Sequence, residues 1–250
     1  MLKGALHIHS TYSDGELTLA ELKERFVSDG FSFACLTDHA ESFDREKLRA
    51  YVTECDALSD SEFLFLPGLE YECEKHLHIL GFGVTALAGT TDPESVIRHI
   101  ADRGGVSVIA HPRDHIFDWI ESFAVLPNGL EAWNYRYDGT KGPHVSVYLL
   151  LRRLATRQPG TFAFYGLDLH WARQRRDLGI VVRPTLLRKD QILRALSTGN
   201  YHGSCAGVDL PSNGTLSPQL LEKFCAEGLR PGFLQRWTAW LRRSLKQRRD

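Results

Sequence analysis

The chain has 250 residues, of which 43% are hydrophobic and 24% charged, a composition typical of one main globular domain. This composition excludes a disordered chain and a collagen-like repeat, and the five scattered cysteines, without a CxxC pair, argue against a disulfide framework. No apolar run reaches the roughly 18 residues of a membrane-spanning helix, and the N-terminus lacks the layout of a signal peptide. We therefore expect a cytoplasmic protein.

The formal net charge of −1 conceals an uneven distribution of charge. Residues 229–250 hold seven of the 30 Lys and Arg residues and one of the 31 acidic residues, which leaves 23 basic and 30 acidic residues in residues 1–228, a net charge of −7. An acidic body argues against a broad nucleic-acid-binding surface, so we expect no nucleic-acid partner. The 11 histidines are about twice the number expected of an average soluble protein, which indicates metal binding.

Short β-rich apolar runs alternate with amphipathic stretches along the chain, which is typical of parallel strands joined by crossover helices. The expected strands are 5–9, 31–37, 63–70, 76–82, 106–111, 129–134 and 161–168. One helix is expected to begin after Thr18, where Glu21 completes a capping box, and another after Asp92, which is followed by Pro93. A later helix over 189–197 is expected to stop at Gly199.

Residues 211–250 are expected to form a helical appendage to this domain. From residue 233 onwards, apolar residues recur at helical spacing between basic ones, and they include Trp237 and Trp240. This pattern favours packing of the apolar stripe on the main domain or on a second subunit. A peripheral contact of residues 233–250 with an anionic membrane is the alternative.

Side chains that can bind metal recur where the expected strands end. If the strands form a barrel, their carboxyl ends meet at one rim, so these side chains are expected to share one site. They are His7, His9, Asp38, His39, Glu70, His111, Asp168 and His170, with His78 inside the fourth strand.

Three of these positions, and a nearby loop carboxylate, have a physical interpretation of their own. His7 and His9 are two residues apart on a strand, so both imidazoles point to the same face and can bind one ion, although such a pair alone is weak evidence. Glu70 ends an apolar run, where a charge needs a cation or hydrogen bonds to compensate it. Asp14, in a Ser-Asp-Gly loop, returns a carboxylate over the first strand end, although this tripeptide is more often only a turn.

Taken together, six short motifs resemble those of the PHP (polymerase and histidinol phosphatase) superfamily of metal-dependent phosphoesterases. They occur in one order and at family-like spacing between residues 4 and 203. The motifs are His7-Ile8-His9-Ser10 with Ser13-Asp14-Gly15, Leu36-Thr37-Asp38-His39, Gly68-Leu69-Glu70, His78-Ile79-Leu80-Gly81, Ile109-Ala110-His111-Pro112 and Gly166-Leu167-Asp168-Leu169-His170.

The resemblance implies an α/β fold, a distorted (β/α)7 TIM-like barrel over residues 1–210, with two or three divalent metal ions at its rim. It assigns His7, His9, Glu70 and Asp168 to one ion. A second ion would share Glu70 and add His78 and His111, and a third would take Asp14, His39 and His170. Zn, Mn and Fe all suit such nitrogen and oxygen ligands.

The resemblance also implies hydrolysis of a phosphate ester by a metal-bridging hydroxide, and we expect a phosphomonoesterase acting on a small phosphorylated metabolite. The alternatives within enzymes are a nucleotide phosphoesterase and a protein-tyrosine phosphatase. The alternative outside enzymes is a non-catalytic module that uses the same scaffold to bind a phosphate or lipid partner.

Five further residues have two interpretations each. Asp38 either orients a ligand imidazole or makes a loop hydrogen bond. Arg113 and Arg136 either clamp a substrate phosphate or pair with surface acids. His202 either contacts phosphate, as a general acid for example, or is a plain loop histidine. Glu131 ends the sixth expected strand together with Trp133, where a position at the rim is one interpretation and packing, the usual role of Trp, is the other.

Overall fold

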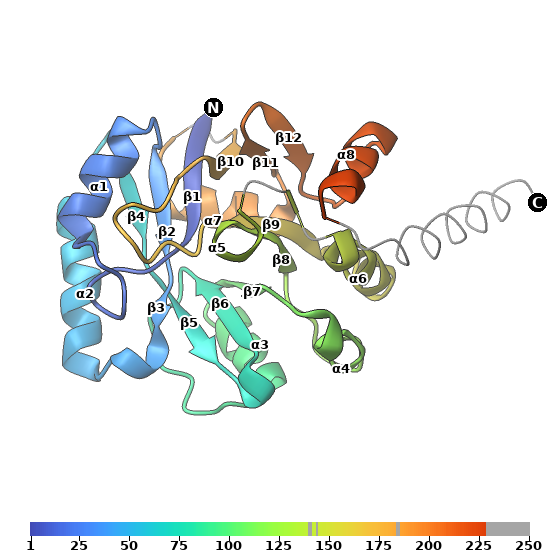
Figure 1. The fold of residues 1–250 in the computed structure, drawn as a ribbon. Helices are drawn as coiled ribbons and strands as arrows, with labels where there is room; N and C mark the ends of the chain where they lie inside the picture. Colours follow the sequence, from blue (N-terminus) through green and yellow to red (C-terminus); the bar gives the residue numbers. More distant parts are fainter. Residues whose placement is uncertain (140–141, 144, 184–185, 229–250) are drawn as a thin grey trace, which may run out of the picture.

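The computed structural model describes residues 1–139, 142–143, 145–183 and 186–228 (Figure 1). Its strands are β1 (Leu2–Ile8), β2 (Phe33–Leu36), β3 (Asp38–His39), β4 (Leu64–Leu66), β5 (Gly68–Glu72), β6 (His78–Phe82), β7 (Val106–Ile109), β8 (Gly129–Asn134), β9 (Phe162–Gly166), β10 (Leu178–Val182), β11 (Tyr201–Cys205) and β12 (Val208–Pro211). Its α-helices are α1 (Leu19–Ser28), α2 (Arg45–Leu58), α3 (Pro93–Ala101), α4 (Phe117–Glu121), α5 (Tyr135–Asp138), α6 (Val145–Arg157), α7 (Lys189–Thr198) and α8 (Pro218–Gly228). Three 3-10 helices are η1 (Ala40–Ser42), η2 (Glu74–His76) and η3 (Asp114–Ile116).

The strands form two six-stranded sheets, in the orders β12-β11-β10-β1-β2-β4 and β3-β5-β6-β7-β8-β9. The expected seven-stranded barrel is not confirmed, because the described strands form no closed sheet. The chain changes sheets between β4 and β5 at Pro67, which has no N–H to donate to a strand ladder. The two sheets meet at the end of β1, where the His9 amide donates to the Leu169 carbonyl at 3.0 Å.

Each of the seven expected strands is present in part, but the expectation that all are parallel is wrong. The strand β6 pairs antiparallel with both β5 and β7, and β10 pairs antiparallel with β1. Because β6 runs backwards, its first residue, His78, lies at the same rim as the last residues of its neighbours; Glu72, the last residue of β5, is its register partner.

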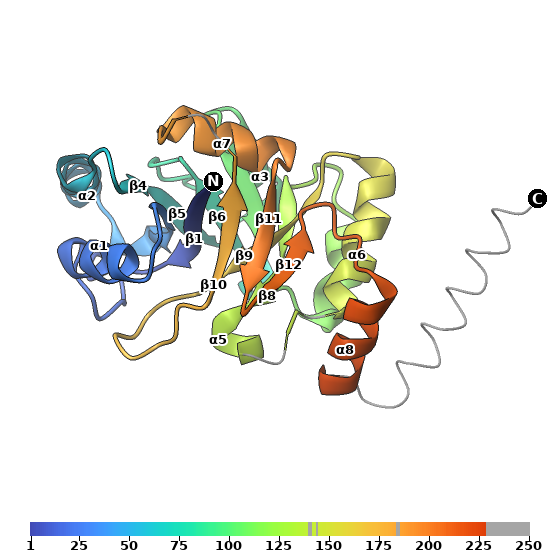
Figure 2. The same ribbon diagram turned by 90° about the horizontal axis from the view of Figure 1, so that it is seen from above.

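The helix start and stop signals of the sequence are confirmed. Thr18 and Glu21 form a reciprocal capping box on α1, the Asp92 side chain accepts from the Ser95 amide at the start of α3, and Gly199 ends α7 with a left-handed φ of 66°. Helices α1 and α2 cover one flank, and α6 and α8 lie on the opposite flank with the strands between (Figures 1 and 2). One hydrophobic core fills the space between the strands and these helices.

The expected boundary between domain and appendage at residue 210 falls inside β12, which pairs with β11. The division into two domains therefore stays a prediction. The proposed amphipathic helix over residues 233–250 lies outside the described residues. Within the described ranges, no helix is long and apolar enough to cross a membrane.

Candidate metal centre

The end of β1 brings two buried imidazoles together. The pairing of β1 with β2 shifts register between Leu6 and Ile8, so a bulge falls at His7, which has a φ of 60°. The rings of His7 and His9 are 5.2 Å apart, and both residues are buried. The two imidazoles converge as expected, but on a bulged strand rather than by regular alternation.

Glu70 occupies the middle of the candidate centre. Its Oε2 atom lies 3.4 Å from His7 Nε2, 3.2 Å from His9 Nε2 and 3.5 Å from His39 Nδ1. Its Oε1 atom contacts His78 Nδ1 at 2.9 Å and His111 Nε2 at 3.5 Å. A carboxylate reached by five imidazoles from four segments of the chain is suited to bridge two cations.

The loop carboxylate of Asp14 lies over one side of the centre. Its Oδ1 atom is 3.4 Å from His9 Nδ1 and 3.6 Å from His39 Nε2, and its Oδ2 atom is 3.2 Å from His170 Nε2. Asp168, which follows β9, approaches from the other side, with Oδ1 3.7 Å from His7 Nε2 and 3.1 Å from His170 Nδ1. All nine expected ligand positions therefore lie in one contiguous cluster.

Three groups in this cluster each have ligand atoms within 4.8 Å of one another. They are His9, Asp14, His39 and His170; His7, His9 and Asp168; and His7, Glu70 and His111. These groups resemble the three expected ligand sets but share His7 and His9 between them. His78 belongs to none of the three and contacts the cluster through its hydrogen bond with Glu70.

Three of the cluster residues have left-handed backbone conformations that residues other than glycine rarely adopt. The φ angles are 60° at His7, 30° at His111 and 49° at Asp168. Such strained positions persist only where the surrounding structure enforces them, and they concentrate at functional sites.

The cluster shifts the pKa values of its own members. Burial alone would lower the pKa of His7, but the Glu131, Asp168 and Glu70 carboxylates outweigh it and raise that pKa well above its usual value. Burial would raise the pKa of Glu70, yet the neighbouring imidazoles hold it well below its usual range. Asp168 is likewise held ionised, because His7 and His170 outweigh its burial. The Glu70 and Asp168 carboxylates are thus charged at neutral pH, as carboxylate ligands of a metal must be.

The buried imidazole nitrogens test whether these residues fit a metal. His7 Nε2, both ring nitrogens of His9, and His39 Nδ1 are buried and make no hydrogen bond in the structure. Buried polar atoms without partners are rare in native proteins, since each costs free energy. A divalent cation bound between the imidazoles and carboxylates would satisfy them, so the donor set fits metal binding.

A comparison with protein families identifies the first half of this arrangement, since the PHP domain family model matches residues 5–113. Residues 5–113 are therefore similar to the PHP domain family. The match covers the segment from His7 to His111, while Asp168 and His170 lie beyond it.

One curated protein is similar to part of this chain. The DNA polymerase/3'-5' exonuclease PolX of Bacillus subtilis (strain 168) is 34% identical over 79 residues. This match covers 28% of the present chain and only 14% of PolX.

Two solved structures share the fold. A two-domain protein from Bacteroides vulgatus, which contains a predicted PHP-like metal-dependent phosphoesterase, has a TM-score of 0.60 and 15% identity, over 90% of this chain and 69% of that one. An amidohydrolase from Chromobacterium violaceum has a TM-score of 0.50 and 19% identity, over 77% of this chain and 96% of that one. At these identities the likeness concerns the fold alone.

Glu131 lies behind the cluster and supports it, although the sequence indicated this role only weakly. Its Oε1 atom is 2.9 Å from His7 Nδ1, and its Oε2 atom accepts from the His111 amide at 2.9 Å and from Asn134 Nδ2 at 2.8 Å. This contact directs the other ring nitrogen of His7 towards Glu70 and Asp168. A buried acid inside an apolar strand was the only sequence signal for this role.

Asp38 is buried and holds the loop that carries Asp14. Its carboxylate accepts from the Ser10 amide at 2.8 Å and from the Ser13 hydroxyl at 2.7 Å. These contacts agree with the loop hydrogen bond and not with the orientation of an imidazole, because the carboxylate faces the turn.

The two arginines differ in their contacts. Arg136 Nη1 lies 3.3 Å from Asp168 Oδ1 and 3.1 Å from His170 Nε2, so it reaches the cluster itself. Arg113 is exposed and stacks on Tyr137, with its guanidinium carbon 4.4 Å from the ring centroid.

His202 is not brought to the cluster. In the sheet register it pairs with Val181, which pairs with Lys3 near the start of β1. It therefore lies at the opposite end of β1 from His9, about 20 Å away at the usual rise per residue. The interpretation of His202 as a phosphate-contacting acid does not agree with this position. His202 lies near the start of β11, which runs in the same direction as β1 and therefore begins at the end of the sheet away from the cluster.

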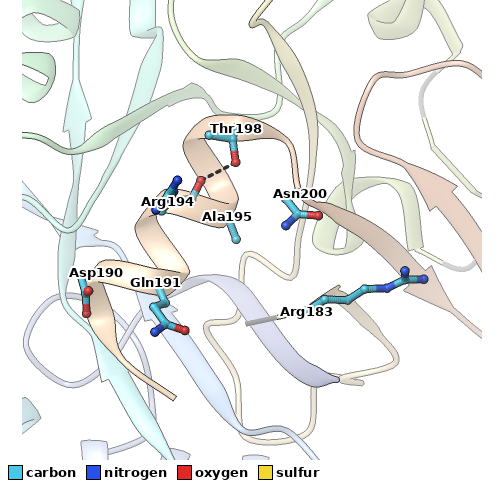
Figure 3. A pocket seen from close by; sticks show the side chains of 7 residues that line it. All are labelled: Arg183, Asp190, Gln191, Arg194, Ala195, Thr198 and Asn200. Carbon is cyan, nitrogen blue, oxygen red and sulfur yellow. Dashed lines mark hydrogen bonds between the residues drawn. The ribbon is translucent and has the colours of Figure 1, made fainter. Parts of the chain in front are cut away.

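A polar pocket lies at that same opposite end, between α7 and the ends of β10 and β11 (Figure 3). Its volume is about 370 Å³. It is lined by Arg183, Asp190, Gln191, Arg194, Ala195, Thr198 and Asn200. None of these residues is among the expected ligands, so this pocket is separate from the candidate metal centre.

Proposed function

We propose that this protein is a metal-dependent phosphoesterase that hydrolyses a phosphate monoester of a small metabolite. The observation that carries the proposal is the cluster around Glu70, in which buried imidazole nitrogens without hydrogen-bond partners face ionised carboxylates. The similarity to the PHP domain family supports the same conclusion, as does the phosphoesterase named for the Bacteroides vulgatus protein of similar fold.

The three ligand groups of the cluster would hold two or three divalent ions, with Zn, Mn and Fe as the candidates. Such ions supply Lewis acidity, which makes water nucleophilic near neutral pH and offsets the charge on phosphoryl oxygens.

The chain's own residues would position the substrate. Arg136, which has one guanidinium nitrogen against Asp168, lies where it can donate to a phosphate held at the cluster. Arg113 would approach the same phosphate from the exposed side. Glu131 fixes the orientation of His7, and Asp38 fixes the loop of Asp14, so neither part of the cluster has to rearrange when substrate binds.

A phosphodiester is the second candidate substrate, because the relative of highest identity given above is named as a 3'-5' exonuclease. The net charge of −7 over residues 1–228 weighs against a nucleic-acid polymer and keeps the monoester first.

The test combines metal analysis with hydrolysis of an aryl phosphate by protein loaded with Mn²⁺. We expect two or three bound metal equivalents and turnover that a chelator abolishes. The His9→Ala variant should lose both metal and turnover, while His202→Ala, a histidine variant at the opposite end of β1, should keep both.

Turnover that survives metal removal, or a His9→Ala variant with full metal content and activity, would contradict the proposal. Faster hydrolysis of a bis-aryl phosphate than of the aryl phosphate would instead favour the phosphodiester. Stoichiometric metal without hydrolysis of either ester would favour the non-catalytic module.

A further inference from the structure

Four side chains beside the metal cluster form an alternating series of guanidinium groups and aromatic rings, which we call the Arg–aromatic row: Arg113, Tyr137, Arg136 and Trp171. The guanidinium carbon of Arg113 lies 4.4 Å from the Tyr137 ring centroid. The guanidinium carbon of Arg136 lies 5.6 Å from the Tyr137 centroid and 4.7 Å from the Trp171 centroid. Arg136 therefore contacts both rings.

The Arg–aromatic row lies directly against the cluster. The Tyr137 ring centroid is 5.2 Å from that of His111, and the Trp171 centroid is 5.8 Å from that of His170. Arg136 joins the row to Asp168 through its contact at 3.3 Å. A substrate whose phosphate reached the cluster would have its remaining part next to these rings.

Both rings are open to solvent. Tyr137 is 49% exposed and Trp171 is 41% exposed, and they are the exposed aromatic side chains among the residues that the structure describes. Neither contributes to the hydrophobic core. Solvent-exposed rings held by cation–π contacts, one on each of two cluster histidines, have the chemistry of a stacking platform for a planar ligand.

We propose that the Arg–aromatic row binds the base of a nucleoside phosphate, with Tyr137 and Trp171 as the residues that determine specificity. The base stacks on the exposed rings, and the Arg136 guanidinium between them donates to the phosphate. The acidic body favours a mononucleotide over a polymer. This inference rests on the proposed function, since it takes the cluster as the binding site of the phosphate.

The test compares the affinities of adenosine monophosphate and ribose 5-phosphate for protein loaded with Mn²⁺, each measured as the inhibition constant against aryl phosphate hydrolysis or, if the protein hydrolyses no ester, by titration calorimetry. The two ligands differ in the base. Stacking of one base on an aromatic side chain contributes enough for an affinity difference of about 5-fold or more. We expect this difference in the unmodified protein, its loss in Tyr137→Leu and Trp171→Leu, and its retention in Tyr137→Phe and Trp171→Phe.

Equal affinity for the two ligands, no binding of adenosine monophosphate, or an undiminished difference in both Leu variants would overturn the inference. The aryl phosphate assay separates this failure from failure of the proposed function. Hydrolysis without base preference removes only the role of the row, whereas base preference without hydrolysis of any ester removes only the phosphoesterase.

Discussion

Glu131 is buried under the metal cluster and makes its contacts with His7, His111 and Asn134 from a single carboxylate. It takes one ring nitrogen of His7 as a partner and leaves the other facing Glu70 and Asp168. Residues that orient a metal-binding imidazole in this way commonly change metal affinity by about 10- to 100-fold when they are replaced.

We therefore expect Glu131→Gln to weaken metal binding by about 10- to 100-fold while the protein stays folded. The measurement is a titration with Mn²⁺, with circular dichroism as the check on folding. Glu72→Gln is the matched control, because Glu72 pairs with the exposed His76 and should bind metal like the unmodified protein. An unchanged dissociation constant for Glu131→Gln would show that His7 needs no such partner.

The residues that form the cluster could be predicted from the sequence because each lies in a short motif near a strand end. The role of Glu131 could not, because it depends on contacts between β8 and residues 20 and 124 positions away along the chain. For His202 the sequence suggested a role in the site that its position does not support. The expected strands did not include β11, so the sequence did not show which end of the sheet this histidine reaches.

Strand β9 lies directly against the His7–Glu131 pair, and Gly166 is the residue at the contact. A Cβ atom built there would lie 1.9 Å from Glu131 Oε1 and 2.9 Å from His7 Cβ. No side chain fits at this position unless the pair moves, so the glycine is required by close packing.

Gly166→Ala is expected to destabilise the protein by about 1–3 kcal/mol, as overpacking in a core does, and to weaken metal binding as well. Thermal unfolding and a Mn²⁺ titration measure the two effects. Gly160→Ala is the control, because nothing lies within 4 Å of its Cβ position, and its stability should be unchanged or slightly raised. A Gly166→Ala protein as stable as the control would contradict the packing argument.

Element positions followed from the sequence better than their directions did. Apolar runs and caps located seven strands and the starts of α1 and α3. The pattern could not show that β6 is antiparallel, because a short buried strand has the same composition in either direction. The strands β10, β11 and β12 were not expected at all, since polar and glycine residues interrupt their apolar runs.

At the scale of the whole molecule, the candidate ligands join the two sheets. His7 and His9 belong to the end of β1 in one sheet, while Glu70, His78 and His111 come from the other. A cation bound between them would therefore connect segments from both sheets.

Metal should accordingly raise the stability of the whole protein. At a free metal concentration 100 times the dissociation constant, the expected gain is about 2.7 kcal/mol, which corresponds to roughly 5–10 °C in Tm for a chain of this size. Calorimetric unfolding with Mn²⁺ or with a chelator measures this. The gain should vanish in His9→Ala, and an equal Tm in metal and chelator would exclude a cation that joins the sheets.

The left-handed backbone at His7, His111 and Asp168 has a consequence for anyone who tries to transplant this centre into a designed scaffold. Idealised strands exclude such angles at residues other than glycine, so grafting the side chains alone would aim three of them in the wrong direction. A designer would have to copy the bulge and the irregular strand ends first and add the ligands afterwards. A transplanted centre therefore needs this backbone conformation as well as the side chains.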